Sequence, residues 1–243
     1  MRLDKYLFEN GFFESRARAQ AAIAAGCVSV NGGAEPRPDK KIGPADRITV
    51  TAGSCPYVSR AGLKLKAGLT EFNLSPHGKI CLDVGAATGG FTDCMLKEGA
   101  AGVYAIDVGA GQLHPSLKAH PLVHFMPGTN ARSLDPARFP ARPQLCGIDV
   151  SFISLKLVLG PVIECLAPGA DIIALIKPQF ELSRAQLVRG IVKDEKLHAG
   201  VILSLRRFLK KTRPEVKDYA TAVSPVTGAH GNTEFLWHLK AAV

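Results

Sequence analysis

Four charged residues are spaced so that a fold could bring them to one place for proton chemistry. Asp149 and Lys177 each end a short apolar run, Glu234 opens the last such run, and Lys64 lies in an earlier helical pattern. Two lysines and two carboxylates together can orient a hydroxyl group and help to remove its proton. Each residue also has a plain interpretation: Asp149 as a helix cap, Lys177 as a solvated strand end, and Lys64 as a surface lysine.

A glycine-rich turn marks a second candidate site. It follows the apolar run 80–84 and leads into a helical pattern over 91–98. A strand, a turn and a helix in this order present backbone N–H groups and a helix N-terminus to a ligand. The turn has neither the G-x-G-x-x-G fingerprint nor the Lys-Ser/Thr pair of a phosphate loop. Asp83, just ahead of the glycines, suits a neutral or cationic ligand better than a pyrophosphate.

Asp107 strengthens the interpretation of this turn as a binding site. It ends the apolar run 102–107 and lies 22 residues after Gly85. An acidic residue about 20 positions beyond such a turn, at the end of the next strand, is placed to bind ribose hydroxyls. The two features together predict a site for a ligand that carries a nucleoside.

The elements that must position these residues follow from the pattern over residues 59–243. Strand-like runs alternate with helical patterns, which predicts an α/β fold with a doubly wound, mostly parallel, seven-stranded sheet. If the last two strands form a hairpin, the final one runs antiparallel and Glu234 reaches the edge where the parallel strands end. The expected strands are 80–84, 102–107, 122–126, 145–149, 170–176, 216–223 and 233–239. Helices are expected at 154–166, interrupted by Pro161, and at 197–210.

Residues 1–58 have a pattern of their own. Helical spacing near 3–8 and 15–23, then short strands at 27–31 and 46–50, predict a small α+β domain before a linker. Its basic residues gather at the start of the second helix and near both ends of the domain. The segment holds 8 Lys and Arg against 6 Asp and Glu, so its net charge alone indicates little.

Composition narrows the class of partner. The chain has 243 residues, 47% of them hydrophobic, and a net charge of +9. This charge favours an acidic partner such as nucleic acid, although a basic protein without one is the alternative. The six cysteines and seven histidines show no metal-ligand spacing, so no metal site is expected. The absence of a signal-peptide pattern and of a long apolar run predicts a cytoplasmic protein without membrane spans.

Long motifs throughout the chain resemble the TlyA (hemolysin A) family of S4-domain ribosomal RNA 2′-O-ribose methyltransferases, which are related to the FtsJ group. The resemblance is carried by DVGAATGGFTD (83–93), DVGAGQL (107–113), DVSFISL (149–155), IKPQFE (176–181), SRAGLKL (59–65) and GNTE (231–234). The motifs RLDK (2–5), SRARA (15–19) and GCVSVNG (26–32) are similar to the S4 RNA-binding fold. The departures are Ala87, where serine is usual, and Ala61, where a second glycine is common.

This resemblance implies a Rossmann-like methyltransferase domain at 59–243 that uses S-adenosylmethionine without a metal, and an S4-like RNA-binding domain at 1–58. It implies an FtsJ-like catalytic tetrad of Lys64, Asp149, Lys177 and Glu234, with Lys177 either as the base or as the group that orients the hydroxyl. The cofactor-binding residues are then Asp83, Gly85, Ala86, Thr88, Gly89, Gly90, Phe91, Asp107 and Asp149. The RNA-binding residues are Arg2, Lys5, Arg16, Arg18, Lys40, Lys41 and Arg60.

The implied partner is ribosomal RNA or a ribosomal subunit, with cytidine as the target nucleotide. The chain begins almost directly at its S4-like motif, which resembles the shorter family members that act on the large subunit. Three alternatives stay open: a non-catalytic RNA- or ribosome-binding protein on a methyltransferase fold, a haemolysin, and an S4-bearing pseudouridine synthase. The sequence does not indicate an oligomeric state.

Overall fold

The structure is a computed structural model that describes residues 1–13, 15–24, 26–35, 37–50, 56–109, 111–228 and 231–242, without the side chains of Arg18, Ala21, Ala24 and Ala34. The chain divides into two compact units, Met1–Arg60 and Ala61–Val243. Each unit is described by itself.

The first unit is a small α+β fold. Helices α1 (Leu3–Glu9) and α2 (Arg16–Ala24) pack on an antiparallel sheet of strand order β2-β1-β3. The strands are β1 (Val28–Val30), β2 (Gly33–Ala34) and β3 (Ile48–Val50). The sequence did not predict β2, which Asn31 and Gly32 join to β1 in a two-residue turn. Both turn residues have positive φ, 55° and 81°, as a tight hairpin turn of this kind requires.

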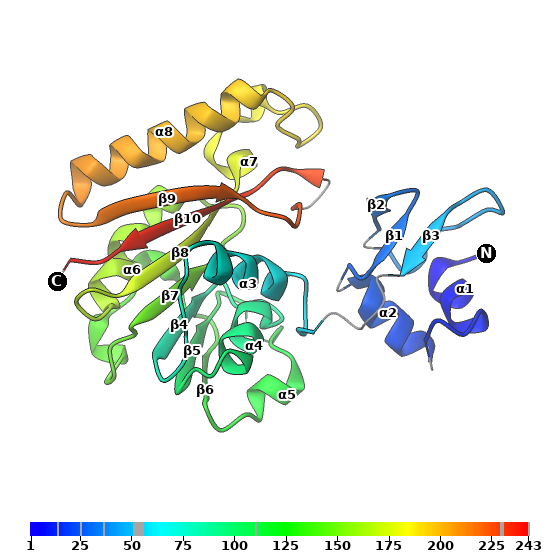
Figure 1. The fold of residues 1–243 in the computed structure, drawn as a ribbon, viewed down its shortest axis with the longest axis horizontal. Coiled ribbons are helices and arrows are strands. Elements are labelled where there is room, and N and C mark those ends of the chain that lie inside the picture. Colours follow the sequence, from blue (N-terminus) through cyan, green and yellow to red (C-terminus); the bar gives the residue numbers. More distant parts are fainter. Residues whose placement is uncertain are drawn as a thin grey trace. The chain divides into compact units, whose positions relative to one another are not determined.

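The second unit is built on a seven-stranded sheet of order β6-β5-β4-β7-β8-β10-β9 (Figure 1). Strands β4 to β8 are parallel, and β10 runs antiparallel to both of its neighbours, β8 and β9. The strands are β4 (Ile80–Val84), β5 (Gly102–Ile106), β6 (Val123–Met126), β7 (Leu145–Ile148), β8 (Asp171–Ile176), β9 (Lys217–Val223) and β10 (Phe235–Lys240). The predicted doubly wound, mostly parallel sheet is confirmed.

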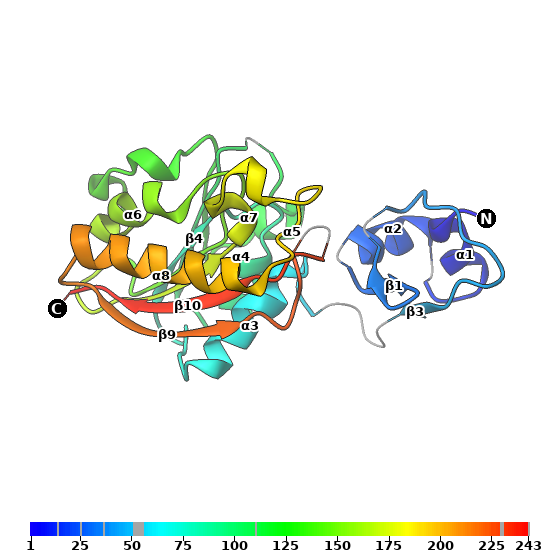
Figure 2. The same ribbon diagram turned by 90° about the horizontal axis from the view of Figure 1, so that it is seen from above.

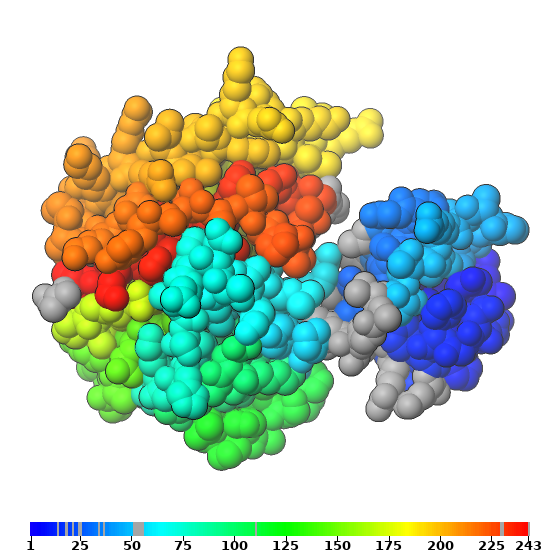
Figure 3. Space-filling view, viewed as in Figure 1, coloured from blue at the N-terminus to red at the C-terminus, as the bar shows by residue number. Residues whose placement is uncertain are grey.

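Helices cover both faces of this sheet (Figures 1 and 2). The side chains of a strand point alternately to the two faces of a sheet. Strand β8 is buried along its whole length, so both faces are covered there. Ile173 lies against Gly68 of α3, whereas Ile172 belongs to the core that α6 and α8 share. The helices are α3 (Ala61–Glu71), α4 (Gly90–Lys97), α5 (Pro115–Lys118), α6 (Leu159–Cys165), α7 (Pro178–Glu181) and α8 (Glu195–Thr212). In the space-filling view, the surface of α3 adjoins that of the β9–β10 strands (Figure 3).

Two helix boundaries differ from the sequence-based expectation for clear reasons. The segment expected as one helix over 154–166 is a 3-10 turn, Leu155–Leu157, followed by α6. Pro161 therefore lies in the first turn of α6, where a backbone N–H would have no partner within the helix anyway. Helix α8 starts two residues earlier than expected because Asp194 caps it by accepting the N–H of Lys196.

Candidate active site

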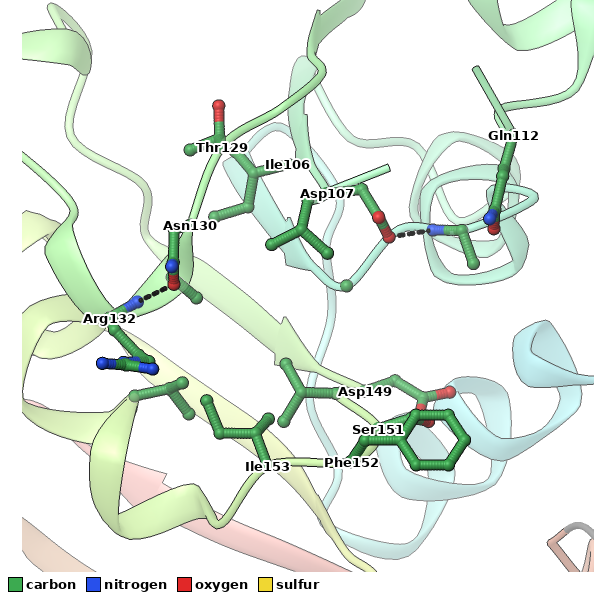
Figure 4. Close-up of a pocket in the computed structure, with 16 residues that line it drawn as sticks. Ile106, Asp107, Gln112, Thr129, Asn130, Arg132, Asp149, Ser151, Phe152 and Ile153 are labelled. Carbon is green, nitrogen blue, oxygen red and sulfur yellow. Dashed lines mark hydrogen bonds between the residues drawn. The ribbon is translucent and has the colours of Figure 1, made fainter. Parts of the chain in front are cut away.

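A cavity of about 480 Å³ opens where the parallel strands end (Figure 4). Its lining comes from the loops that follow β4, β5, β6 and β7, so four neighbouring strands contribute to it. This is the position at which doubly wound sheets bind their ligands. The polar lining residues are Asp107, Gln112, Thr129, Asn130, Arg132, Asp149 and Ser151.

The glycine-rich turn is held against two of these loops. Gly85 has a φ of +87°, and a Cβ at this position would lie 2.5 Å from the carbonyl oxygen of Asp149. Only glycine meets both demands at once. The carboxylate of Asp107 accepts the N–H of Ala87 at 2.8 Å and that of Gly109 at 2.7 Å. Asp107 thus fixes the turn and its own loop while it faces the cavity.

The predicted cofactor residues divide into two groups. Gly85, Asp107 and Asp149 line the cavity, together with Ala87, which was not among them. The side chain of Phe91 does not line it, because its ring is 2% exposed and fills the space above Gly147 of β7. The others do not line the cavity either: Ala86, Thr88, Gly89 and Gly90 belong to the turn or the first residue of α4, and Asp83 lies behind it.

Asp83 is fully buried beneath the turn. Its Oδ2 accepts hydrogen bonds from the N–H of Thr92 at 2.8 Å and from its hydroxyl at 2.6 Å. Its Oδ1 is buried without a hydrogen-bond partner among the described residues. Burial raises the pKa of Asp83 to about 7, although the bonds from Thr92 act in the other direction. The carboxyl group of Asp83 is therefore protonated more easily than an ordinary carboxyl group.

Lys177 is the first of two buried lysines at the strand ends. Its Nζ lies 2.5 Å from Asp149 Oδ1 and donates a hydrogen bond of 2.9 Å to Ser151 Oγ. The ring of Phe180 lies 5.9 Å from the same nitrogen. Asp149 and Ser151 both line the cavity, whereas Lys177 does not line it and contacts these two side chains from behind.

Lys64 is the second buried lysine, which overturns its interpretation as a surface residue. It is 8% exposed, and its Nζ pairs with Glu234 Oε2 at 2.6 Å across 170 positions of the chain. Gly228 makes room for this pair, because a Cβ there would lie 2.0 Å from Glu234 Oε1. The neighbouring Lys66 is 46% exposed and pairs with Glu98 at the surface. Composition could not separate these two lysines, whereas packing does.

The strand register brings both pairs to the same end of the sheet. In the antiparallel ladder of β10 and β8, Phe235 lies opposite Ile176. One step further along this register, Glu234 lies opposite Lys177. The structure therefore gathers all four predicted charged residues at one edge, arranged as two ion pairs.

In the first unit, two of the predicted RNA-binding residues share one acid. The guanidinium groups of Arg2 and Arg16 contact Asp4 at 3.0 and 2.8 Å. Lys40 pairs with Glu35 at 2.8 Å.

The remaining predicted RNA-binding residues are less constrained. Lys5 pairs with Glu9 at 3.5 Å in an exposed i,i+4 pair, and Lys41 is exposed. Arg60 is partly buried at the end of the first unit, and the side chain of Arg18 lies outside the described residues.

Comparison with known families gives the identity of both units. The model of the FtsJ-like methyltransferase family matches residues 57–241, and the model of the S4 domain matches residues 1–48. The chain belongs to the FtsJ-like methyltransferase family. It is therefore a methyltransferase with an S4 domain ahead of its catalytic domain.

Several related proteins match nearly the whole chain. Hemolysin A of Brachyspira hyodysenteriae is 40% identical over 98% of this chain and 99% of its own length. The 16S/23S rRNA (cytidine-2′-O)-methyltransferase TlyA of Mycobacterium tuberculosis is 39% identical over 97% of this chain and 88% of its own. A solved structure from Streptococcus thermophilus, named as a hemolysin, is 39% identical with a TM-score of 0.78, covering 100% of this chain and 88% of its own.

More distant structures share the fold alone. The N-methyltransferase NodS of Bradyrhizobium japonicum, solved with S-adenosylhomocysteine, is 12% identical with a TM-score of 0.51, covering 75% of this chain and 85% of its own. Its likeness supports the doubly wound methyltransferase architecture of the second unit.

Several residues of the FtsJ-like site were not found from the sequence. Thr129, Asn130 and Arg132 follow β6, so the strand-end rule that located Asp107 would have found them too. Phe152 follows Asp149 closely; it is 90% exposed and has a φ of +63°, which is strained for a bulky side chain. Gly228 had no signal at all, since its role depends on a distant carboxylate.

The described part of the chain shows neither a metal-binding group nor a membrane span. It contains no cluster of three or more His, Cys, Asp and Glu arranged to hold a metal ion. No described helix is long and apolar enough to cross a membrane.

Proposed function

We propose that this methyltransferase transfers a methyl group from S-adenosylmethionine to a ribose 2′-hydroxyl of ribosomal RNA. The observation that carries the proposal is the position of Lys177, whose ammonium contacts two residues that line the cavity, Asp149 and Ser151. The names of the TlyA relatives support a cytidine target. A ribosomal substrate would place the activity in the cytoplasm.

The cavity suits the proposed cofactor. Its volume of about 480 Å³ is in the range of small-ligand sites. Asp107 offers a carboxylate to ribose hydroxyls, as its place at the end of β5 predicts. Thr129 and Asn130 offer polar atoms to the edge of a base, and Ile106 offers an apolar surface to its face. When bound, S-adenosylmethionine supplies a methyl group on a sulfonium centre, an electrophile that a ribose oxygen can attack.

Lys177 is proposed to act on the substrate hydroxyl. After the ammonium has lost a proton to solvent, Nζ is a neutral amine and accepts the proton of the 2′-OH. Asp149 lies 2.5 Å away, so its negative charge stabilises the ammonium that forms. Ser151 holds Nζ from a second direction and fixes its position. In the alternative role, Lys177 stays an ammonium that orients the hydroxyl without taking its proton. The pH dependence of the reaction distinguishes this role from that of the base.

The second ion pair is proposed to orient the substrate ribose. Lys64 and Glu234 are both buried, so neither charge is screened by solvent. Their direct contact fixes both side chains at the edge of the sheet where Glu234 lies opposite Lys177 in the strand register. Phe152 is proposed to support the base of the same nucleotide, because its exposed ring offers a stacking face beside Ser151. Its partner ring, Phe180, lies 5.0 Å away.

The two domains are proposed to divide binding from chemistry, with residues 1–58 binding RNA and residues 59–243 catalysing the transfer. Arg2, Lys5, Arg16, Arg18, Lys40, Lys41 and Arg60 are the proposed RNA contacts. The proposed cofactor contacts are Asp107 and the turn from Gly85 to Gly90, with Asp83 and Phe91 shaping the turn from behind. No metal is part of this proposal.

A methyl-transfer assay tests the proposed function. The purified protein is incubated with methyl-labelled S-adenosylmethionine and with separately purified small and large ribosomal subunits. Alkaline hydrolysis of the RNA should leave the label in resistant dinucleotides, because a 2′-O-methyl group blocks cleavage at that position. Label on a base, or no transfer to either subunit, would contradict the proposal. A cytidine of the large subunit stays the predicted target, and the two subunit reactions decide it.

A further inference from the structure

The N-terminal unit holds two arginines on an acid that has no contact with solvent. The side chain of Asp4 is 0% exposed, whereas those of Arg2 and Arg16 are 48% and 47% exposed. Arg2 donates two hydrogen bonds to Asp4, of 3.0 and 3.1 Å, and Arg16 donates one of 2.8 Å. The acid is thus inside the unit while its cations reach the surface.

A second buried acid repeats this arrangement. Glu35 accepts a hydrogen bond of 3.1 Å from the guanidinium of Arg37 and pairs with Lys40 at 2.8 Å. Its side chain is 8% exposed, against 69% for Arg37 and 29% for Lys40. The backbone N–H of Arg37 donates to the same Oε1 at 3.1 Å as its guanidinium does, while Lys40 contacts Oε2, so both carboxylate oxygens are engaged.

The two clusters lie next to each other. The N–H of Leu3 donates to the carbonyl of Lys40 at 2.8 Å, and that of Asp4 donates to Pro38 at 3.0 Å. A backbone bridge joins Arg2 to Lys41. The start of α1 and the segment 37–42 therefore form one surface that carries the cations of both acids.

Burial of the acids has a physical consequence for these cations. Exposed ion pairs hold their side chains weakly, and a buried carboxylate is unfavourable unless its lone pairs are satisfied. Asp4 satisfies this demand with further bonds from the N–H of Lys5 at 2.8 Å and from Gln20 at 2.7 Å. A guanidinium has five N–H donors, so Arg2 and Arg16 keep donors for another acceptor while Asp4 fixes their direction.

Building on the proposed RNA-binding role of this unit, we propose that Asp4 and Glu35 are positioning residues of its RNA surface. Their carboxylates hold Arg2, Arg16, Arg37 and Lys40 in the orientation that contacts neighbouring phosphates of the RNA backbone. Guanidinium groups fit phosphate oxygens in a bidentate manner, so a fixed direction matters for them. Arg37 becomes an RNA contact that the sequence did not predict.

A positioning role of Asp4 predicts the opposite change in RNA affinity from the one that charge alone predicts. The substitution Asp4→Asn removes a negative charge from a surface that binds a polyanion. Simple electrostatics predicts tighter RNA binding for this variant. If the acid orients the arginines, binding weakens despite the added positive charge. Asp39→Asn is the matched control, because Asp39 is an exposed acid on the same segment and its neutralisation changes the charge equally.

The experiment measures the affinity of the full chain for purified large ribosomal subunits at several salt concentrations. Asp4→Asn should weaken binding about threefold and make the negative slope of log K against log salt shallower by about one, the value for one lost phosphate contact. Glu35→Gln should act in the same direction, and Asp39→Asn should not weaken binding. Affinity for S-adenosylmethionine should be retained in all three.

Hydrogen exchange over residues 1–24 shows whether Asp4→Asn stays folded. If α1 loses its protection, Gln20→Ala decides, because this variant removes one bond to Asp4 without changing the charge. Weaker RNA binding by Gln20→Ala supports the positioning role. Unchanged or tighter binding by the folded variants overturns it.

The proposed RNA-binding function fails in a different way. The triple variant Arg2→Ala, Arg16→Ala and Lys40→Ala removes cations that both acids hold. If it binds subunits as tightly as the parent protein, this unit is not the RNA surface and the proposed function itself is wrong for it. If it binds weakly while Asp4→Asn does not, only the positioning role is wrong.

Discussion

The two units of this protein use acid–cation pairs in opposite ways. At the strand ends of the methyltransferase domain, both the lysines and their acidic partners are at most 12% exposed: Lys64 with Glu234, and Lys177 beside Asp149. In the N-terminal unit the acid is buried and its arginines are half exposed. A buried cation keeps its charge unscreened for chemistry, and an exposed cation on a buried acid presents its charge to a large polyanion.

Two buried aspartates, one in each unit, differ in the direction of their pKa shifts. Asp4 and Asp83 are both fully buried. The guanidinium of Arg2, with Gln20 and Arg16, holds the pKa of Asp4 far below its ordinary value, whereas burial without a cation raises the pKa of Asp83 to about 7. Burial alone therefore does not determine the protonation of a carboxylate; its partners do.

The largest expected effect is that of Lys177→Ala. If the buried cation serves chemistry, this variant should lower the rate of methyl transfer by about 10²- to 10⁴-fold, the usual contribution of a general base. Affinity for S-adenosylmethionine should change little. Single-turnover transfer and calorimetric titration measure the two quantities.

Lys64 and Lys66 supply the matched control for burial. Lys64→Ala should also slow transfer strongly, while Lys66→Ala, which removes an exposed lysine two positions away, should leave the rate within about twofold because surface pairs contribute little. Equal effects of the two variants would show that burial does not separate catalytic from surface lysines here.

A smaller but still large effect is expected for Gly228→Ala. The added Cβ would lie 2.0 Å from Glu234 Oε1, so the carboxylate must move, and we expect this to disturb its contact with Lys64. Misplacement of about 1 Å in a catalytic group can reduce a rate by about 10²-fold. We expect a loss of about 10- to 100-fold in the single-turnover rate.

Gly200→Ala is the control for this substitution. Gly200 lies inside α8 with no atom within 4 Å of an added Cβ. Alanine there should stabilise the fold by about 0.5–1 kcal/mol and leave transfer intact. If Gly228→Ala behaves in the same way, the close approach to Glu234 does not constrain catalysis.

An intermediate effect is expected when the exposed cations are removed. The double variant Arg2→Ala and Arg16→Ala should raise the KM for ribosomal subunits by about 10-fold at physiological salt, because two phosphate contacts are lost. The increase in KM caused by the double variant should become smaller as the salt concentration is raised, whereas the rate loss caused by Lys177→Ala should not. A salt-independent defect would show that these arginines act through the fold rather than through RNA.

The smallest expected effect is a difference in the pH dependence of stability of the two units. The raised pKa of Asp83 means that the folded form holds more protons than the unfolded form between about pH 4 and pH 7. The free energy of unfolding of the second unit should therefore fall as pH rises through this range. The pKa of Glu35 is lowered to about 2 by Arg37 and Lys40 against the effect of burial, so the first unit should lose stability as pH falls from about 5 to 2.

Separate probes can follow each unit in the full chain. Trp237 is the single tryptophan and is fully buried in the second unit, so its fluorescence follows that unit. Hydrogen exchange over residues 1–24 follows the first. Asp83→Asn should flatten the dependence between about pH 4 and pH 7 in the cofactor-free protein. If both units respond to pH with the same sign, the contrast between Asp4 and Asp83 is wrong.

Local patterns were enough to locate most of the site. Apolar runs marked where each strand ends, and parallel strands share one edge, so Asp107, Asp149 and Lys177 could be placed together before any coordinates. The spacing of Gly85 and Asp107 predicts a nucleoside site at the same edge. The placement of Asp107, Asp149 and Lys177 at one edge is confirmed, because strand ends are a property of short segments and the carboxyl ends of parallel strands lie at the same edge of a sheet.

Side-chain burial and pairing could not be read from such segments. Lys64 and Lys66 are two residues apart with the same chemistry, and only the packing of α3 on β8 and β10 makes one buried and the other exposed. Gly228 and Phe152 matter because of atoms that are close in space and carry no local signal. Phe91 lies in the predicted motif, yet its ring belongs to the core because Gly147 leaves space above β7.

The sequence by itself determined the fold class, the family and the edge of the sheet where the candidate site lies, because apolar periodicity and glycine turns act within short stretches of chain. Only the tertiary structure decided which charges are buried and which acid holds which cation. Those properties depend on contacts across many residues, such as the pairing of Lys64 with Glu234 over 170 positions, and no local pattern encodes them.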